Sequence, residues 1–182
     1  MNLPDFQNPA SLNRWMSRVA CGAILAALLG GCAAPRQFPS PTAKWRNSIG
    51  QLQYVNPKRS VIGDVLVAWQ GGRDFQLEFT HGPVSLMKLQ IDSDLARVES
   101  AVVRIPWQGS AAHAPKPLRS WIALRDVFTQ LAAQPPSATR AVLESNEQPA
   151  WKAEATMDAA GPAHLRVEFR ETGERFVFHF AR

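Results

Sequence analysis

The stretch LRVEFRETGERFVFHF, residues 165–180, decides the fold class of this chain of 182 residues. Apolar and polar residues alternate on both sides of Thr172-Gly173, which is typical of two antiparallel strands joined by a turn. A pairing of Glu171 with Glu174 sends all the apolar side chains to one face of the hairpin. The opposed pairs are then Phe169 with Phe176, Val167 with Phe178, and Leu165 with Phe180. A sheet with one apolar face needs a covering element, which the rest of the chain must provide.

The same alternation extends over residues 61–105 and predicts a meander of half-buried strands. Apolar residues share one parity within each of the segments 61–69, 75–79 and 87–91. Segments rich in glycine, proline and aspartate separate them, at 71–74, 81–83 and 92–94. Short turns of this kind join neighbouring antiparallel strands, so we expect consecutive hairpins.

One helix is predicted over about residues 117–134. Pro117 suits the first turn of a helix, and Pro135-Pro136 cannot continue one. The apolar positions are Leu118, Trp121, Ile122, Leu124, Val127, Phe128, Leu131 and Ala132, and the polar strip is Arg119, Asp126 and Gln130. Because the apolar arc covers well over half of the circumference, the helix should be buried on most sides. The sequence therefore predicts a mostly β fold, in which a strongly curved antiparallel sheet, or unclosed barrel, wraps around this helix.

The N-terminal segment has the features of a lipoprotein signal peptide. Arg14 and Arg18 precede an uncharged apolar run of about a dozen residues, which ends in Leu29-Gly30-Gly31-Cys32. The run is shorter than the roughly 20 residues that a membrane-spanning helix needs. We therefore expect residues 1–31 to be removed and Cys32 to become the first residue, carrying an S-diacylglycerol and an N-acyl group. An ordinary signal peptide, or a short buried helix with a chance cysteine, is the alternative.

The rest of the chain is expected to form a tether and one domain. Residues 32–44 are rich in proline and read as an extended tether, and residues 45–182 read as a single domain. Cys21 leaves with the signal peptide and Cys32 carries lipid, so no disulfide is expected. The formal net charge of +5 comes from scattered basic residues, which together with export argues against nucleic acid as a partner. Either Met1 or Met16 fits as the start.

Behind this lipobox, the order of strands, helix and final hairpin resembles the family of LolB and LolA, which localise lipoproteins. The similar pieces are Ile49-Gly50, Pro117-Leu118, Trp121-Ile122 and Trp151. The resemblance implies an apolar cavity that accepts acyl chains or lipoprotein cargo. It also implies a periplasm-facing protein, and Ala33 in place of an aspartate favours the outer membrane as the site of anchoring. The candidate cavity residues are Trp69, Phe75, Leu77, Phe79, Trp121 and Phe128.

Two other classes of function stay open. LolB-like receptors carry a protruding loop with an exposed apolar residue, whereas Thr80-His81-Gly82-Pro83 is short and not apolar. The same tryptophans and phenylalanines also suit a filled core, as in a scaffolding lipoprotein that binds an envelope partner. A hydrolase is the third class, and no catalytic constellation supports it.

The remaining motifs are weak, so neither an enzyme nor a cofactor is expected. Ser85 and Lys88 match an SxxK spacing, but they lie in strand-like sequence that would place them on opposite faces. Asp92-Ser93-Asp94 lacks the further oxygen ligands of a calcium site. The four histidines are His81, His113, His164 and His179. They show no metal-binding spacing, so no metal is predicted. Besides the membrane, the expected partners are acyl chains or lipoproteins, and a monomer is expected.

Overall fold

The computed structural model describes residues 38–102, 106–135, 137–159 and 161–181. The predicted signal peptide and Cys32 lie outside these residues, so their processing and lipidation stay predictions. Residues 38–182 group as one unit by their contacts.

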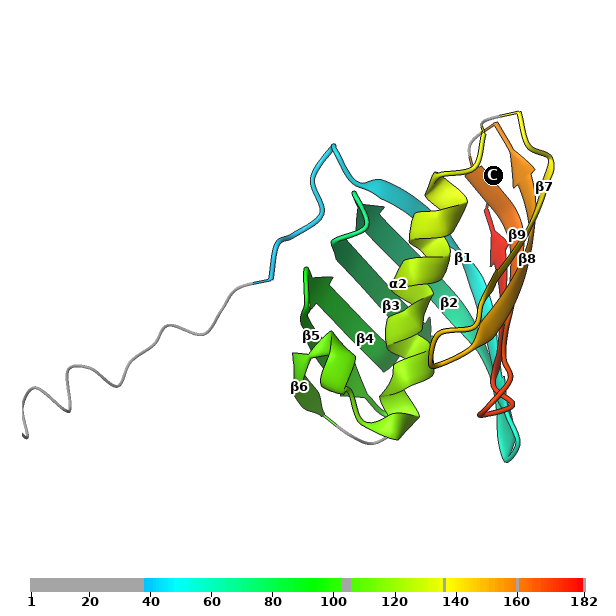
Figure 1. Cartoon of the computed structure of the whole chain (residues 1–182). Helices are drawn as coiled ribbons and strands as arrows, with labels where there is room; N and C mark the ends of the chain where they lie inside the picture. Colours follow the sequence, from blue (N-terminus) through cyan, green and yellow to red (C-terminus); the bar gives the residue numbers. More distant parts are fainter. Residues whose placement is uncertain (1–37, 103–105, 136, 160, 182) are drawn as a thin grey trace, which may run out of the picture. The chain divides into compact units, whose positions relative to one another are not determined.

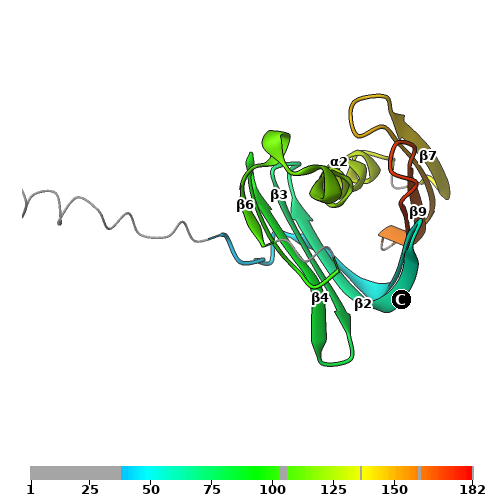
Figure 2. The same ribbon diagram turned by 90° about the horizontal axis from the view of Figure 1, so that it is seen from below.

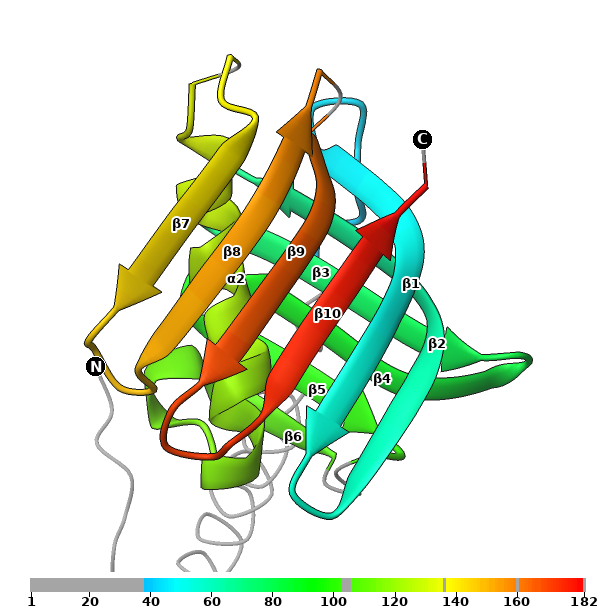
Figure 3. The same ribbon diagram turned by 90° about the vertical axis from the view of Figure 1, so that its right-hand side faces the viewer.

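Within the described ranges, ten strands form one antiparallel sheet that does not close (Figure 3). The strands are β1 (Arg46–Asn56), β2 (Arg59–Gln70), β3 (Asp74–His81), β4 (Val84–Asp92), β5 (Leu95–Ser100), β6 (Trp107–Ser110), β7 (Arg140–Ser145), β8 (Trp151–Asp158), β9 (Gly161–Phe169) and β10 (Arg175–Phe180). Their order is β6-β5-β4-β3-β2-β1-β10-β9-β8-β7, so the first and last strands pair in the middle of the sheet. The predicted meander and unclosed, mostly β fold are confirmed, while β6 and β7 were not foreseen.

Glycines let the central strands approach one another closely. A Cβ added to Gly50 would lie 2.1 Å from the carbonyl oxygen of His179, and one added to Gly63 would lie 1.9 Å from that of Thr80. No other residue fits at such distances, so both positions require glycine. They lie on β1 and β2, where the sheet bends most sharply between its two walls (Figure 2).

The helix occupies the concave side of the sheet. A 3₁₀ turn (Lys116–Leu118) leads into α2 (Arg119–Ala132), close to the expected helix. Figure 1 shows α2 lying across the sheet, and Figure 2 shows it between the wall of β2 to β6 and the wall of β7 to β9. The predicted polar strip of Arg119, Asp126 and Gln130 is exposed. The wide apolar arc is buried, so one helix covers the apolar face of both walls.

Aromatic rings fill the space between α2 and the sheet. The centroid of the Trp121 ring lies 4.9 Å from that of Tyr54 and 4.7 Å from that of Phe176. The Phe128 centroid lies 5.1 Å from that of Trp69 and 5.6 Å from that of Phe178. Trp121 and Phe128 are both fully buried, which confirms that they pack against the sheet.

The final hairpin forms as expected, but its predicted register is wrong by two residues. Phe169 donates its N–H to the Glu174 carbonyl at 2.9 Å, and Gly173 donates to the Phe169 carbonyl at 3.0 Å. The turn is therefore the four residues 170–173, with Gly173 at φ +65°. Val167 lies opposite Phe176 and Leu165 opposite Phe178. A shift of two keeps every side chain on its face, so the apolar pattern could not distinguish the two registers.

Candidate functional site

Two open depressions meet where α2 ends. The first, which we call the end groove, has a volume of about 540 Å³ and lies between the end of α2, the start of β1 and the β8–β9 turn. Its apolar lining includes Trp45, Trp69, Leu131, Ala138, Met157 and Pro162. The second, which we call the side notch, has a volume of about 660 Å³. Both are bordered by Asn47, Ser48, Asp158, Ala159 and Pro162, so the two depressions adjoin.

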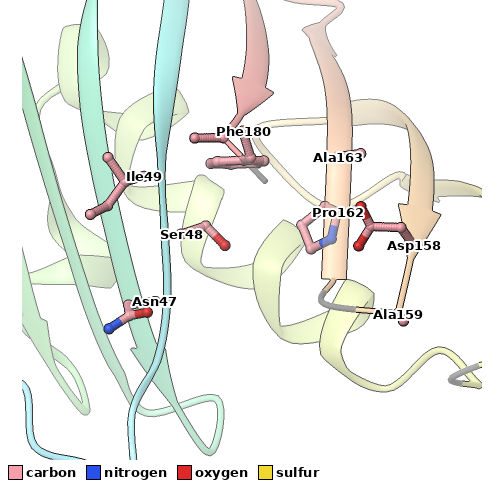
Figure 4. Close-up of a pocket in the computed structure, with 9 residues that line it drawn as sticks. Asn47, Ser48, Ile49, Asp158, Ala159, Pro162, Ala163 and Phe180 are labelled. Carbon is pink, nitrogen blue, oxygen red and sulfur yellow. The ribbon is translucent and has the colours of Figure 1, made fainter.

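The side notch exists because β10 is shorter than its neighbours. Phe180, at the end of β10, pairs with Gly50, whereas β1 continues back to Arg46. Figure 4 shows Asn47 and Ser48 on β1 across the gap from Pro162 on β9. The side notch therefore lies beyond the end of β10, between the start of β1 and the start of β9.

The rim of the end groove is polar and carries one cation, Arg46, and one anion, Asp158. Arg46 donates from Nη1 to the Ala132 carbonyl at 3.5 Å, where a cation meets the negative end of the helix dipole. Lys44 and Arg46 also border a smaller depression of about 300 Å³ beside Trp69. Asp158 is the acidic residue that lines the end groove.

Trp69 has a buried indole N–H beside the groove. Like Nε1 of Trp121 in the core, Nε1 of Trp69 has no hydrogen-bond acceptor among the described residues. A buried N–H without an acceptor costs about 1–3 kcal/mol. A polar oxygen of a ligand in the end groove would be the natural acceptor if the ring turned.

The six predicted cavity residues belong mainly to the aromatic core. They are Trp69, Phe75, Leu77, Phe79, Trp121 and Phe128, and none is more than 6% exposed. Of these, Trp69 also borders the end groove. The space around Trp121 is filled by the rings of Tyr54, Phe79 and Phe176. Binding of a ligand next to Trp121 therefore stays a prediction, and it requires α2 to move.

A buried polar cluster fixes the other end of α2. Tyr54 donates its hydroxyl to Oε1 of Glu174 at 2.6 Å, and Ser120, in the first turn of α2, donates to Oε2. Asn56 donates to the Tyr54 oxygen at 3.2 Å. Burial, followed by the hydrogen bond to Glu174, raises the pKa of Tyr54, so this hydroxyl stays protonated as a donor. The helix is thus tied to β1 and to the turn before β10 at its start, and faces an open groove at its end.

The other motifs gain no support from the structure. Ser85 and Lys88 both lie on β4, three residues apart along a strand. Among the described residues, no group of three or more histidine, cysteine, aspartate or glutamate side chains is arranged to hold a metal ion. That part of the chain also contains no helix with the length and apolar character needed to cross a membrane.

The β3–β4 hairpin differs from the short loop without an apolar residue that the sequence suggested. It projects past the neighbouring strands (Figure 3), and Val84 at its tip is 52% exposed. Ile62 on β2, whose carbonyl lies 2.9 Å from Nδ1 of His81, is also exposed. An apolar side chain therefore stands at this tip, one residue beyond the segment that the sequence suggested.

Comparisons with known proteins find similar solved structures but no sequence match. No family model and no curated protein matches the chain. The solved structures that resemble it include a LolA superfamily protein from Nitrosomonas europaea, with 9% sequence identity and a TM-score of 0.35. The match covers 75% of this chain and 83% of that one.

Proposed function

We propose that the protein binds acyl chains, of a lipid or of a lipid-modified protein, as an outer-membrane-anchored periplasmic lipoprotein of LolB-like function. The end groove is the observation that supports this most directly. It combines an apolar lining with a polar rim, and its volume of about 540 Å³ lies within the range of small-molecule sites. A linear acyl chain would leave its polar end at Arg46 and Lys44 and pass its methylenes over Trp45, Trp69 and Met157.

The energetics of such a complex are favourable. Burial of one methylene contributes about 0.8 kcal/mol, so eight methylenes contribute roughly 6 kcal/mol. That gain offsets much of the association cost, which is about 4–15 kcal/mol. Measurable affinity therefore requires a chain of medium length or longer, and short-chain acids should bind poorly.

Longer chains need room beyond the groove, and α2 is the element that can provide it. The buried carboxylate of Glu174 holds the start of the helix through Ser120, whereas the weak Arg46 contact at 3.5 Å lies at its end. We expect the end of α2 to move outward while its start stays fixed. Chains would then follow the helix from Leu131 toward Phe128 and the predicted cavity residues.

The membrane anchor rests on the sequence. Lipid on Cys32 would hold the domain at the membrane surface through the proline-rich tether, close to a source of acyl chains. The proposal includes no cofactor and no catalysis, and it describes a monomer.

The test is binding of a fluorescent fatty acid to the chain with Cys32→Ala, which lacks the proposed lipid. Met157→Asp places a charge in the groove at a half-buried position and should weaken binding at least tenfold. Val142→Asp is the matched control, because Val142 is 57% exposed on β7, away from the groove. A brominated fatty acid should also quench tryptophan fluorescence through Trp45 and Trp69. No binding up to the solubility limit, or equal loss in both variants, would exclude the proposal.

The scaffolding lipoprotein is the second candidate, and the filled space around Trp121 favours it. In that case α2 never moves, and the function lies on the outer surface. Arg119 and Asp126 on the exposed strip of the helix are the first residues to replace. Loss of a partner on substitution there, with no acyl binding in the groove, would establish this alternative.

A further inference from the structure

Two histidines meet on the outer face of the sheet. His164 on β9 lies directly opposite His179 on β10. Their ring centroids are 4.7 Å apart, with an interplanar angle of 60°. The expected register would have placed His164 opposite Ala181, so the true four-residue turn is what brings the two imidazoles together.

The hydrogen-bond pattern makes this pair a close one. Phe169 donates its N–H to the Glu174 carbonyl, so these residues occupy a hydrogen-bonding position, and hydrogen-bonded and non-hydrogen-bonded positions alternate from there along the hairpin. His164 and His179 fall at a non-hydrogen-bonded position, where facing side chains are closest. His179 is exposed and His164 is partly exposed, so both rings can be reached from solvent.

The groups beside the two rings are neutral or ion-paired. The neighbouring cation on β9, Arg166, forms an ion pair with Glu168, which offsets its charge. Thr156 on β8 is the cross-strand neighbour of His164, and Gln51 on β1 is that of His179. The two histidines are therefore flanked by neutral side chains that carry oxygen atoms.

We propose that His164 and His179 form a two-imidazole chelating site for a divalent transition metal ion that prefers nitrogen ligands, Cu²⁺ above Zn²⁺. Imidazole is a suitable ligand for both ions. Among divalent first-row metal ions, Cu²⁺ binds a given nitrogen site most tightly. Water would complete the coordination, because the site is open to solvent. The proposal is independent of acyl-chain binding, since these side chains lie on the face opposite α2.

The experiment titrates CuSO₄ and, separately, ZnCl₂ into the full chain with Cys32→Ala and Cys21→Ser, so that no thiol competes. We expect one Cu²⁺ per chain, tighter than Zn²⁺, and a rise in melting temperature, because the unfolded chain does not hold the two rings together. His164→Gln and His179→Gln should each weaken Cu²⁺ binding at least tenfold, and the matched controls His81→Gln and His113→Gln should not.

Paramagnetic broadening by Cu²⁺ gives a second readout that does not depend on affinity. Resonances of residues around His164 and His179 should broaden first, before those around His81. Unchanged binding in both paired variants, or broadening centred elsewhere, would overturn the proposal. The absence of any thermal shift or broadening at millimolar metal would do so as well.

Discussion

Removal of one hydroxyl group tests the buried cluster that holds the start of α2. Tyr54→Phe keeps the ring and therefore its packing against Trp121 and Phe176, whose centroids lie 4.9 and 5.1 Å away. It deletes the hydrogen bond of 2.6 Å to Oε1 of Glu174 and leaves Ser120 as the donor to Oε2. A hydrogen bond to a charged group is worth about 1.5–3 kcal/mol, so the free energy of unfolding should fall by that amount.

Urea denaturation of Tyr54→Phe, Glu174→Gln and the double variant measures the loss and its coupling. Because both partners belong to one network, the sum of the stability losses in the two single variants should exceed the loss in the double variant by about 0.5–3 kcal/mol. Hydrogen exchange should also speed up for amides in the first turns of α2, near Ser120, more than for those near Leu131. A loss below about 0.5 kcal/mol with additive effects would refute the idea that this cluster fixes the helix.

Three further outcomes follow from the sequence and the structure. Trp121→Ala and Phe128→Ala should each cost about 3–5 kcal/mol in thermal or chemical denaturation, because both side chains are fully buried, and losses below about 1 kcal/mol would contradict the packing. The pKa of His164 is lowered in the folded state, so the unfolded chain binds its proton more readily, and stability should fall as the pH drops from about 7.5 through the ordinary value of about 6.5. His164→Gln should flatten that part of the curve, and an unchanged slope would argue against it. Mass spectrometry of the membrane fraction should find acylated Cys32 as the first residue, and a Cys32→Ala protein that stays equally membrane-bound would disprove lipid anchoring.

The strands and the helix were predictable because an element that is buried on one face carries apolar residues at regular spacing along its sequence. The alternation in β2 and β10 and the apolar arc of α2 each follow from contact with the same core. β6 and β7 were missed because apolar and polar residues do not alternate along them. β7, for example, has the sequence RAVLES, and its Leu143 is only partly buried. Both lie at the edges of the sheet, where neighbours on one side are absent and burial imposes less on the sequence.

The sites were harder to predict because they depend on pairings between distant residues. Tyr54 and Glu174 are 120 positions apart, and their contact depends on β1 pairing with β10. The side notch depends on where β10 ends relative to β1, which no apolar pattern records. The histidine pair depends on a register that the pattern left undetermined. Trp69, by contrast, was among the predicted cavity residues and does border the end groove, although its role in binding stays a prediction.

The pairing of β1 with β10 has a consequence for the biogenesis of the chain. The Gly50–Phe180 pair joins residues 130 positions apart, so the middle of the sheet cannot assemble until residues as far as β10 have emerged from the ribosome. Non-local pairings of this kind form slowly, because the entropic cost of closing a long loop comes before any contact offsets it. The predicted export signal would benefit from that delay, since the secretion machinery would receive the chain before a stable sheet can form. The same topology makes deletion of β10 unusually damaging, because β10 is a central strand and not an edge strand.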